Sequence, residues 1–185
     1  MSDRLSGTRI AFLVANEGVE QIELTDPWDA VKEQGATPTL VSLETGEVQG
    51  FNHLTAADTF EATVAAGSSS VDDYDALVLP GGVANPDQLR ADDDAVAFVS
   101  AFFEAGKPVA AICHAPWTIV EAERTKGRTL TSWPSLATDI RNAGGTWVDE
   151  EVVVCTDGPN TLITSRNPDD LPAFCEKTVE AIAGT

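Results

Sequence analysis

The sequence predicts a single α/β domain over residues 1–185, doubly wound, with a mostly parallel sheet flanked by helices on both faces. Three observations predict this fold. The length of 185 residues suits one domain. Short apolar runs have the composition of strands that are buried on both faces. Segments with helical periodicity alternate with these runs, as they do in right-handed βαβ units.

The first part of the chain supplies two predicted strands joined by a helix. Thr8–Ala15 is a continuous apolar run of strand length, and Thr37–Leu43 follows it as a second strand. A helix that stops at Gly35 is expected between them, because apolar residues lie near helical spacing at Ile22, Leu24, Trp28 and Val31. Glycines punctuate residues 46–63, which predicts a short hairpin, and residues 65–73 (AAGSSSVDD) are the expected loop.

The second part of the chain continues the alternation. Asp75–Leu79 and Pro108–Ile112 are predicted to be buried strands, with a helix over Asp92–Glu104 between them. Further helical patterns surround Trp117–Glu123 and Ser135–Asn142. The parallel sheet is therefore expected to gain strands and helices in turn along this half of the chain.

The chain ends in a predicted hairpin and a helix. Val152–Val154 and Thr161–Thr164 are short strands, and Asp169–Ile182 is a helix. The inward face of that helix is predicted to hold Leu171, Phe174, Cys175, Val179 and Ile182. The whole order of elements is flavodoxin-like, and such sheets bind ligands at the carboxyl ends of their strands. The chemistry is therefore expected directly after three apolar runs, at residues 16–20, 80–82 and 113–114.

Charge is the unusual feature of the composition. Eleven basic and 30 acidic residues give a formal net charge of −19. Nucleic acids and anionic membrane surfaces bind clustered cations, so neither is expected as a standing partner. The acidity is typical of a heavily solvated surface, and a host that lives at high salt is one explanation. The sequence shows neither a membrane span nor a signal-peptide core, so we expect a cytoplasmic protein.

The spacing of the cysteines and histidines indicates neither a set of disulfides nor a metal site. Cys113, Cys155 and Cys175 are odd in number and widely spaced, which does not suggest disulfides. Neither the cysteines nor His53 and His114 show metal-ligand spacing, so no metal and no cofactor is expected. Cys155 ends an apolar run and Cys175 lies on an apolar helix face, so both are predicted to be shielded. His53 belongs to a polar segment and is predicted to lie on the surface.

The segment PVAAICHAPW is the sharpest chemical feature. A predicted strand ends at Cys113 and a helical pattern begins at once, which is typical of a nucleophile elbow. The tight turn needs small residues on both sides, and Ala111 and Ala115 supply them. The elbow would place the thiol at a helix N-terminus, whose dipole lowers a thiol pKa. The alternative is a buried structural cysteine.

A nucleophilic thiol benefits from a base and an oxyanion site. No histidine follows His114 in the chain, so His114 or His53 is the available base. The turn Pro80-Gly81-Gly82 offers unhindered amides, and those of Gly82 and His114 could form an oxyanion hole.

The segment NEGVEQIEL brings three carboxyl groups to the same edge of the sheet, those of Glu17, Glu20 and Glu23. One carboxyl near a thiolate would be pushed towards its protonated form and could then donate a hydrogen bond to sulfur. The alternative is an acidic first helical turn that favours the helix dipole.

The order of six segments resembles that of the PfpI-like family, within the class I glutamine amidotransferase-like superfamily: ANEGVEQIEL, DALVLPGG, GKPVAAICHAPW, TSWPS, NAGGTWVDEEVVV and SRNPDDLPAF. The resemblance covers about Thr8 to Ile182. The family includes proteins described as intracellular proteases, general stress proteins and protein deglycases. The sequence departs from the family pattern at Ala115, where glycine is more usual, and before the Gly-Arg pair at residues 127–128.

The resemblance implies roles for individual residues. Cys113 would be the nucleophile and His114 its neighbouring histidine. Glu20, rather than the other two glutamates of its segment, would hydrogen-bond the thiol. Asp87 of a neighbouring subunit would orient His114, which implies a homodimer or a higher homo-oligomer with the site at the interface. The candidate residues of the substrate pocket are Gly81, Trp117 and Trp133.

The resemblance implies a cysteine hydrolase or lyase, and three activities stay open. The preferred one is a glutathione-independent glyoxalase or deglycase, which acts on methylglyoxal or on glycated amino groups of proteins and peptides. The second is an intracellular cysteine peptidase. The third is a redox-sensing or chaperone-like stress protein whose cysteine is oxidised without turnover, which an exposed low-pKa thiol would also suit.

Overall fold

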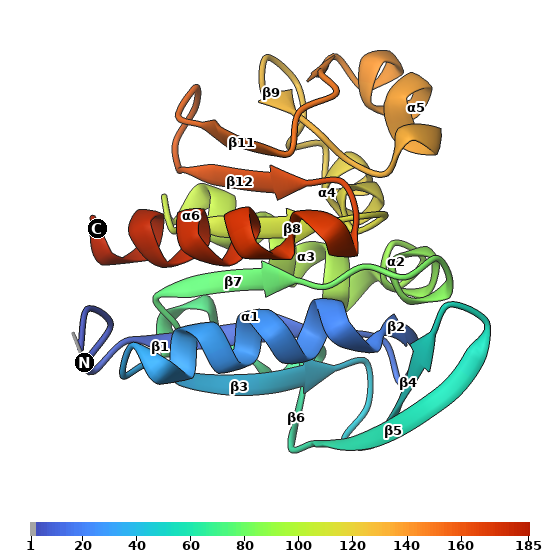
Figure 1. The fold of residues 1–185 in the computed structure, drawn as a ribbon, viewed down its shortest axis with the longest axis vertical. Coiled ribbons are helices and arrows are strands. Elements are labelled where there is room, and N and C mark those ends of the chain that lie inside the picture. The colour runs from blue at the N-terminus through green and yellow to red at the C-terminus, as the bar shows by residue number, and fades with distance from the viewer. Residues whose placement is uncertain (1–2) are drawn as a thin grey trace.

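The structure is a computed structural model and describes residues 3–185. Seven strands form its central sheet: β1 (Arg9–Leu13), β3 (Thr37–Ser42), β6 (Val64–Ala65), β7 (Ala76–Leu79), β8 (Val109–Ile112), β11 (Val152–Cys155) and β12 (Leu162–Ser165). They lie in the order β11-β12-β8-β7-β1-β3-β6 (Figure 1). All neighbours are parallel except β11 and β12. The predicted α/β fold with a mostly parallel sheet is confirmed.

Helices cover both faces of this sheet: α1 (Gln21–Glu33), α2 (Ala84–Leu89), α3 (Asp93–Glu104), α4 (Pro116–Glu121), α5 (Ala137–Asn142) and α6 (Leu171–Ala183). In Figure 1, α1 and α6 lie in front of the sheet and α3 lies behind it. The side chains of β1 alternate between the two faces. Phe12 joins the core beneath α1 and α6, and Leu13 joins the core beneath α3 and α4.

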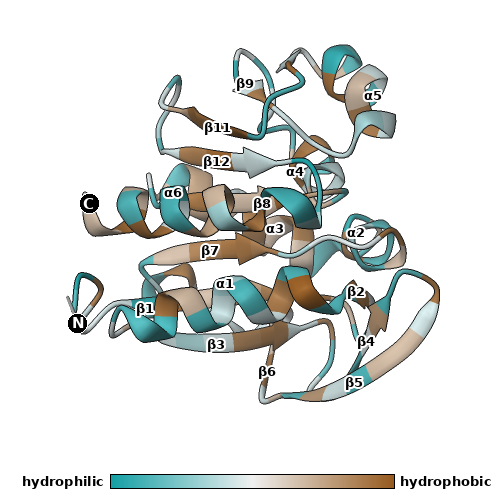
Figure 2. Cartoon of the chain, in the orientation of Figure 1, coloured by the Kyte–Doolittle hydropathy of each residue, from teal (hydrophilic) through white to brown (hydrophobic). Residues whose placement is uncertain are grey.

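Hydropathy follows this arrangement. In Figure 2, β7 is coloured as hydrophobic along most of its length, whereas α1 and α6 alternate between hydrophobic and hydrophilic residues. The predicted inward residues of the last helix are buried, with one exception. Cys175 is partly buried and packs against the core beneath α1 and α6, so the prediction that it is shielded is confirmed only in part. Its position on α6 faces the edge of the contact with α1 rather than its centre, beside Asp26 and Asp29.

A second, three-stranded sheet stands at the carboxyl end of the main sheet. It contains β2 (Glu17–Glu20), β4 (Gly46–Asn52) and β5 (Thr55–Ala62), in the order β2-β4-β5. The antiparallel pair β4 and β5 is the predicted hairpin. Strand β2 was not predicted, because four residues with two glutamates carry no strand periodicity. Figure 1 shows this sheet beside α2, close to the carboxyl end of β7.

The remaining elements are short. Two-residue strands β9 (Thr129–Leu130) and β10 (Thr146–Trp147) pair in parallel, and 3₁₀ turns occupy the ranges Ala66–Ser68, Val71–Asp73, Pro134–Leu136 and Pro168–Asp170. Two of these turns lie in the expected loop at residues 65–73. Within residues 3–185, no helix is both long and apolar enough to cross a membrane.

Candidate active site

Cys113 occupies a sharp turn between β8 and α4. Its backbone φ is +64°, a left-handed conformation that costs a non-glycine residue free energy and is typical of functional turns. Hydrogen bonds hold both sides of the turn: the Cys113 amide donates to the carbonyl of Ser165 at 3.1 Å, and its carbonyl accepts from the Trp133 amide at 2.8 Å. The backbone therefore has the geometry of the predicted nucleophile elbow. The side chain is 5% exposed and lies in the wall of a pocket.

Glu23 is the carboxyl that lies beside the thiol. It is fully buried in the first turn of α1, where its Oε2 accepts a hydrogen bond from the Gly81 amide at 3.0 Å and the carboxyl lies beside Cys113. The prediction that Glu20 holds this position is wrong. Glu20 ends β2, and its carboxylate accepts from the His53 amide at 3.0 Å. The chain leaves the sheet along β2 and returns at α1, so the later glutamate reaches the thiol.

Burial controls the protonation of this pair. It raises the pKa of Glu23 from 4.5 to about 8, so the carboxyl is mostly protonated at neutral pH. Burial also raises the pKa of Cys113, and the charge of Glu23 adds to the increase, while the Gly82 and His114 amides lower it. The expectation of a lowered thiol pKa is therefore wrong, because desolvation of the buried sulfur outweighs the effect of these two amides. The two amides do converge on the sulfur, where the predicted oxyanion hole would lie.

His114 contacts the thiol from the other side. Its Nδ1 lies 3.1 Å from the Cys113 sulfur. Burial lowers the pKa of His114 to about 4, so the ring is neutral at neutral pH and can accept a proton. The ring stacks on Trp133 with centroids 5.4 Å apart and packs against Trp117 at 5.3 Å. The Trp117 indole donates to Asp139 at 2.9 Å, which fixes this aromatic wall.

The pocket in front of the thiol has a volume of about 700 Å³. Apolar side chains and carboxyl groups line it together, with contributions from Glu17, Glu20, Glu23, Phe51, His53, Leu54, Gly82, Val83, Asp87, Cys113, His114, Trp133 and Pro168. Trp133 is therefore a pocket residue as predicted. Gly81 and Trp117 do not line the pocket, so their prediction as pocket residues is wrong. The Gly81 amide instead donates a hydrogen bond to Glu23, and the Trp117 ring packs against His114. Among residues 3–185, no group of three His, Cys, Asp or Glu side chains is placed to hold a metal ion.

Asp87 lies on α2 at the rim of the pocket. Its Oδ1 accepts a hydrogen bond from the Arg90 guanidinium at 3.1 Å. Arg90 in turn lies over the Trp117 ring at 4.8 Å. Within one chain the carboxylate is thus paired with an arginine. The role of Asp87 towards the His114 of a neighbouring subunit stays a prediction.

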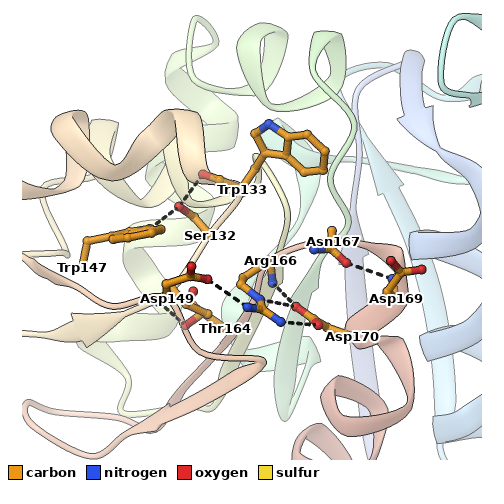
Figure 3. A network of polar contacts seen from close by, with 10 residues as sticks. Ser132, Trp133, Trp147, Asp149, Thr164, Arg166, Asn167, Asp169 and Asp170 are labelled. Atoms are coloured by element: carbon orange, nitrogen blue, oxygen red, sulfur yellow. Dashed lines mark hydrogen bonds and ion pairs between the residues drawn. The ribbon is translucent and has the colours of Figure 1, made fainter.

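Polar contacts hold the segments around Trp133 and Arg166 (Figure 3). Pro168, two residues after Arg166, lines the pocket with Trp133. The Arg166 guanidinium forms hydrogen bonds with both carboxyl oxygens of Asp170 at 2.9 Å and with Asp149 at 2.8 Å. Ser132 donates to the carbonyl of Trp133 and accepts from the Trp147 indole, both at 2.9 Å. These bonds fix the chain on both sides of the pocket wall.

Val83 and Leu54 line the pocket and were not found from the sequence, whereas Glu17 lies at the sheet edge where it was expected. Val83 directly precedes α2 and is 56% exposed, and Leu54 in the β4–β5 turn is 97% exposed. Glu17 enters the pocket because β2 has a register shift between Glu17 and Val19. Helix α2 has six residues and β2 has four with a bulge, so neither shows a periodic pattern in the sequence. The turn of the predicted hairpin is a part of this rim that the sequence does indicate.

Comparison with known proteins identifies the family. The model of the DJ-1/PfpI family matches residues 8–181. The chain belongs to the DJ-1/PfpI family. It is 45% identical over 168 residues to General stress protein 18 of Bacillus subtilis, with 91% of this chain and 94% of that protein covered. It is 38% identical over 166 residues to Protein/nucleic acid deglycase 2 of Escherichia coli, with 90% and 92% covered.

A solved DJ-1/PfpI structure agrees with the fold described above. The crystal structure of Drosophila melanogaster DJ-1beta matches with a TM-score of 0.81 at 26% identity, over 100% of this chain and 92% of that one. Membership in the DJ-1/PfpI family confirms the resemblance found in the sequence. The names of the relatives include a stress protein and a deglycase, so the family establishes the fold and leaves the reaction to be argued from the site.

Proposed function

We propose that this protein is a cysteine-dependent glyoxalase or deglycase that acts on methylglyoxal, or on its adducts with amino groups, without glutathione. One observation carries the proposal: a buried carboxyl with a pKa of about 8, Glu23, lies beside the Cys113 thiol in the same pocket. A group whose pKa lies near the working pH can both give and take a proton. The deglycase named among the relatives supports the same choice.

The first step joins the substrate to the thiol. The Cys113 sulfur attacks the aldehyde carbon of methylglyoxal, a C–S bond forms, and the thiol proton passes to the neutral His114 ring at 3.1 Å. The carbonyl oxygen takes up that proton, which gives a hemithioacetal. With an amine adduct the same carbon is attacked, its C–N bond breaks, and the amine leaves with the proton.

The second step moves a proton within the bound substrate. The carbon attached to sulfur loses its hydrogen as a proton and the neighbouring carbonyl carbon gains one, with Glu23 as the group that carries it. This isomerisation gives a thioester of lactate. Water then cleaves the C–S bond, which releases lactate and restores the thiol. The sum is methylglyoxal plus water to lactate, and no oxidant or reductant is consumed.

The test is lactate formation from methylglyoxal in the absence of glutathione. The native protein is expected to produce lactate, Cys113→Ala to produce none, and Glu23→Gln to lose 10²–10⁴-fold in kcat, the usual contribution of a proton-transfer group. Asp73→Asn is the control, because Asp73 is exposed and precedes β7 at the opposite end of the sheet. Absence of lactate with the native protein would contradict the proposal.

A cysteine peptidase is the second candidate, and the contact between Cys113 and His114 favours it. A neutral histidine 3.1 Å from a thiol is the arrangement of a nucleophile and its base. This mechanism also requires a group that orients the ring, for which we propose Asp87 of a neighbouring subunit. Hydrolysis of a peptide that is lost in both Cys113→Ser and Asp87→Asn would support it. Selective oxidation of Cys113 by peroxide, with neither turnover, would indicate a stress sensor instead.

A further inference from the structure

Asn85 is a fully buried polar side chain in the first turn of α2, and the proposed reaction does not use it. Its Oδ1 accepts a hydrogen bond from the Ala15 amide at 2.7 Å, just beyond the end of β1. Its Nδ2 donates to the carbonyl of Pro80 at 2.9 Å and to that of Gly81 at 3.0 Å. The side chain therefore connects the carboxyl end of β1 to the turn that follows β7.

These three bonds require one acceptor and two donors from one short side chain, which asparagine supplies. The Ala15 amide also determines which end of the side-chain amide is the oxygen, because two donors would otherwise face each other. Leucine has nearly the same shape as asparagine and could form none of these bonds. Asn85 therefore acts at this position through its hydrogen bonds and not only through its volume.

The two carbonyls that Asn85 holds belong to consecutive peptide groups. In a trans peptide the C=O and the N–H point in opposite directions, and no described peptide bond is cis. The Pro80 carbonyl points to Asn85, and the N–H of the same peptide donates to Glu23 Oε2 at 3.0 Å. The Gly81 carbonyl also points to Asn85, so the N–H of that peptide, which belongs to Gly82, points away from it on the pocket side.

The space around these amides is tight, and the backbone does little to restrict them. A Cβ at Gly81 would lie 2.6 Å from the Cys113 Cβ and would collide with the Glu23 carboxyl. The Gly82 amide lowers the pKa of the Cys113 thiol, as expected of an N–H that faces the sulfur. Glycine rotates more freely than other residues, so consecutive glycines need an external restraint. The Glu20 amide also donates to the Gly81 carbonyl, at the longer distance of 3.4 Å.

We propose that Asn85 is a positioning residue, which holds the Gly81 and Gly82 amides in the orientation that the reaction needs. The Gly81 amide keeps the Glu23 carboxyl beside the thiol. The Gly82 amide stabilises negative charge on the Cys113 sulfur, and then on the substrate oxygen. As a role in catalysis, this positioning rests on the function proposed above, whereas its effect on the thiolate can be measured without turnover.

Alkylation of Cys113 by iodoacetamide, an uncharged reagent, measures that effect. The thiolate sulfur forms a C–S bond and iodide leaves, and mass mapping separates Cys113 from Cys155 and Cys175. Asn85→Ala should lower the rate constant at Cys113 about ten-fold or more at neutral pH, the net value of a hydrogen bond to a charged group. A merely structural role predicts the opposite change, because a loosened turn exposes the sulfur and lowers its pKa.

Asn160→Ala is the matched control. Asn160 is 5% exposed, and its side chain accepts a hydrogen bond from Arg128 and donates one to the Lys107 carbonyl at 2.7 Å. It precedes β12, at the end of the sheet opposite to Cys113. The control should lose stability in urea denaturation without slower alkylation. Asn85→Leu is a second variant, which leaves no cavity and adds no charge, and it should also slow alkylation.

Unchanged or faster alkylation in a folded Asn85 variant would overturn the proposal, as would an equal slowing in Asn160→Ala. If neither Asn85 variant folds while Asn160→Ala does, the residue supports the fold rather than the two amides, and the proposal also fails.

A second measurement separates the inference from the proposed function. In lactate formation from methylglyoxal, Asn85→Ala should lower kcat by about 10²–10³-fold, the usual loss of one oxyanion donor, and leave KM little changed. A loss that appears in KM alone would contradict the positioning role. If the native protein forms no lactate while alkylation still slows in the Asn85 variants, the proposed function fails and the positioning of the amides stands.

Discussion

Glu23 and Cys113 are ionisable groups that are buried side by side. The protonation of Glu23 makes the stability of the folded chain depend on pH. The pKa of Glu23 is about 8 in the folded chain and 4.5 as its ordinary value. Between these values the folded state binds more protons than the unfolded state, so stability falls as pH rises. The contribution of Glu23 to the free energy of unfolding should therefore decrease from pH 5 to pH 8, by an amount on the order of a few kcal/mol.

Glu23→Gln should remove that contribution. Glutamine resembles the protonated carboxyl and does not titrate, so urea denaturation should show the variant gaining on the native protein as pH rises from 5 to 8. The other groups, including His114 with its low pKa, titrate in both proteins. Their contributions therefore largely cancel when the free energy of unfolding of the native protein is subtracted from that of the variant. A difference that does not change with pH would contradict the assignment of a raised pKa to Glu23.

The choice between Glu20 and Glu23 shows where sequence reasoning ends at the residue scale. Cys113 could be found because a strand pattern stops at it and a helix pattern starts. The three glutamates of NEGVEQIEL lie within seven residues, so any of them could reach the sheet edge. Strand β2 and its bulge decide the matter, and neither has a periodic signal. Burial of Cys113, and of the Glu23 carboxyl beside it, is likewise a tertiary property, which is why the sequence predicts the thiol pKa in the wrong direction.

At the scale of elements, the contact between β2 and the turn after β7 holds the site together. Gly82 has a φ of +85°, and a Cβ there would lie 2.8 Å from the Glu20 amide and collide with the Gly18 carbonyl. Gly82→Ala should therefore displace β2, lower kcat at least 100-fold and cost about 1–3 kcal/mol of stability. Lactate formation and urea denaturation measure the two effects.

Gly127→Ala is the matched control for this prediction. Gly127 has a similar φ of +76°, and a Cβ there would meet nothing within 4 Å. It should carry the same backbone cost of about 1 kcal/mol and retain activity. If Gly127→Ala lost as much activity as Gly82→Ala, backbone strain rather than the contact with β2 would explain the result.

The turn Pro168–Asp170, which brings Pro168 to the pocket, is held by the ion pair between Arg166 and Asp170. Figure 3 shows this pair. The Asp170 side chain is 5% exposed, so removing its partner leaves a buried carboxylate unpaired. Arg166→Met should cost about 2–4 kcal/mol in urea denaturation. Lys177→Met, which breaks an exposed pair with Glu180, should cost far less stability, because water and salt screen that pair. Similar losses in both variants would mean that burial of Asp170 contributes little.

Most elements of the fold could be predicted because they extend over enough residues to show a period. The strand at Thr8–Ala15 and the helix at Asp92–Glu104 were found within a few residues of β1 and α3. The elements that were missed are short: α2 has six residues and β2 has four. They are stabilised by contacts with distant parts of the chain, and these short elements form much of the pocket rim.

At the scale of the whole molecule, the net charge of −19 opposes both folding and association. Salt screens repulsion between exposed charges, with a Debye length of about 10 Å at 0.1 M. The melting temperature should therefore rise as KCl is increased from 0.05 to 1 M. A melting temperature that is flat or falls over this range would mean that the acidic surface does not limit stability.

The same screening should act on assembly, for which we expect a dimer or a larger homo-oligomer. Subunits that each carry −19 repel one another, so association should strengthen as salt rises. If Asp87 of one subunit completes the site of its neighbour, a closed two-fold assembly is the default arrangement, and activity should follow the fraction of assembled protein. Sedimentation and lactate formation across one salt series measure both quantities on the same samples. A fully active monomer at low salt would remove Asp87 from the mechanism and leave His114 to act with the groups of its own chain.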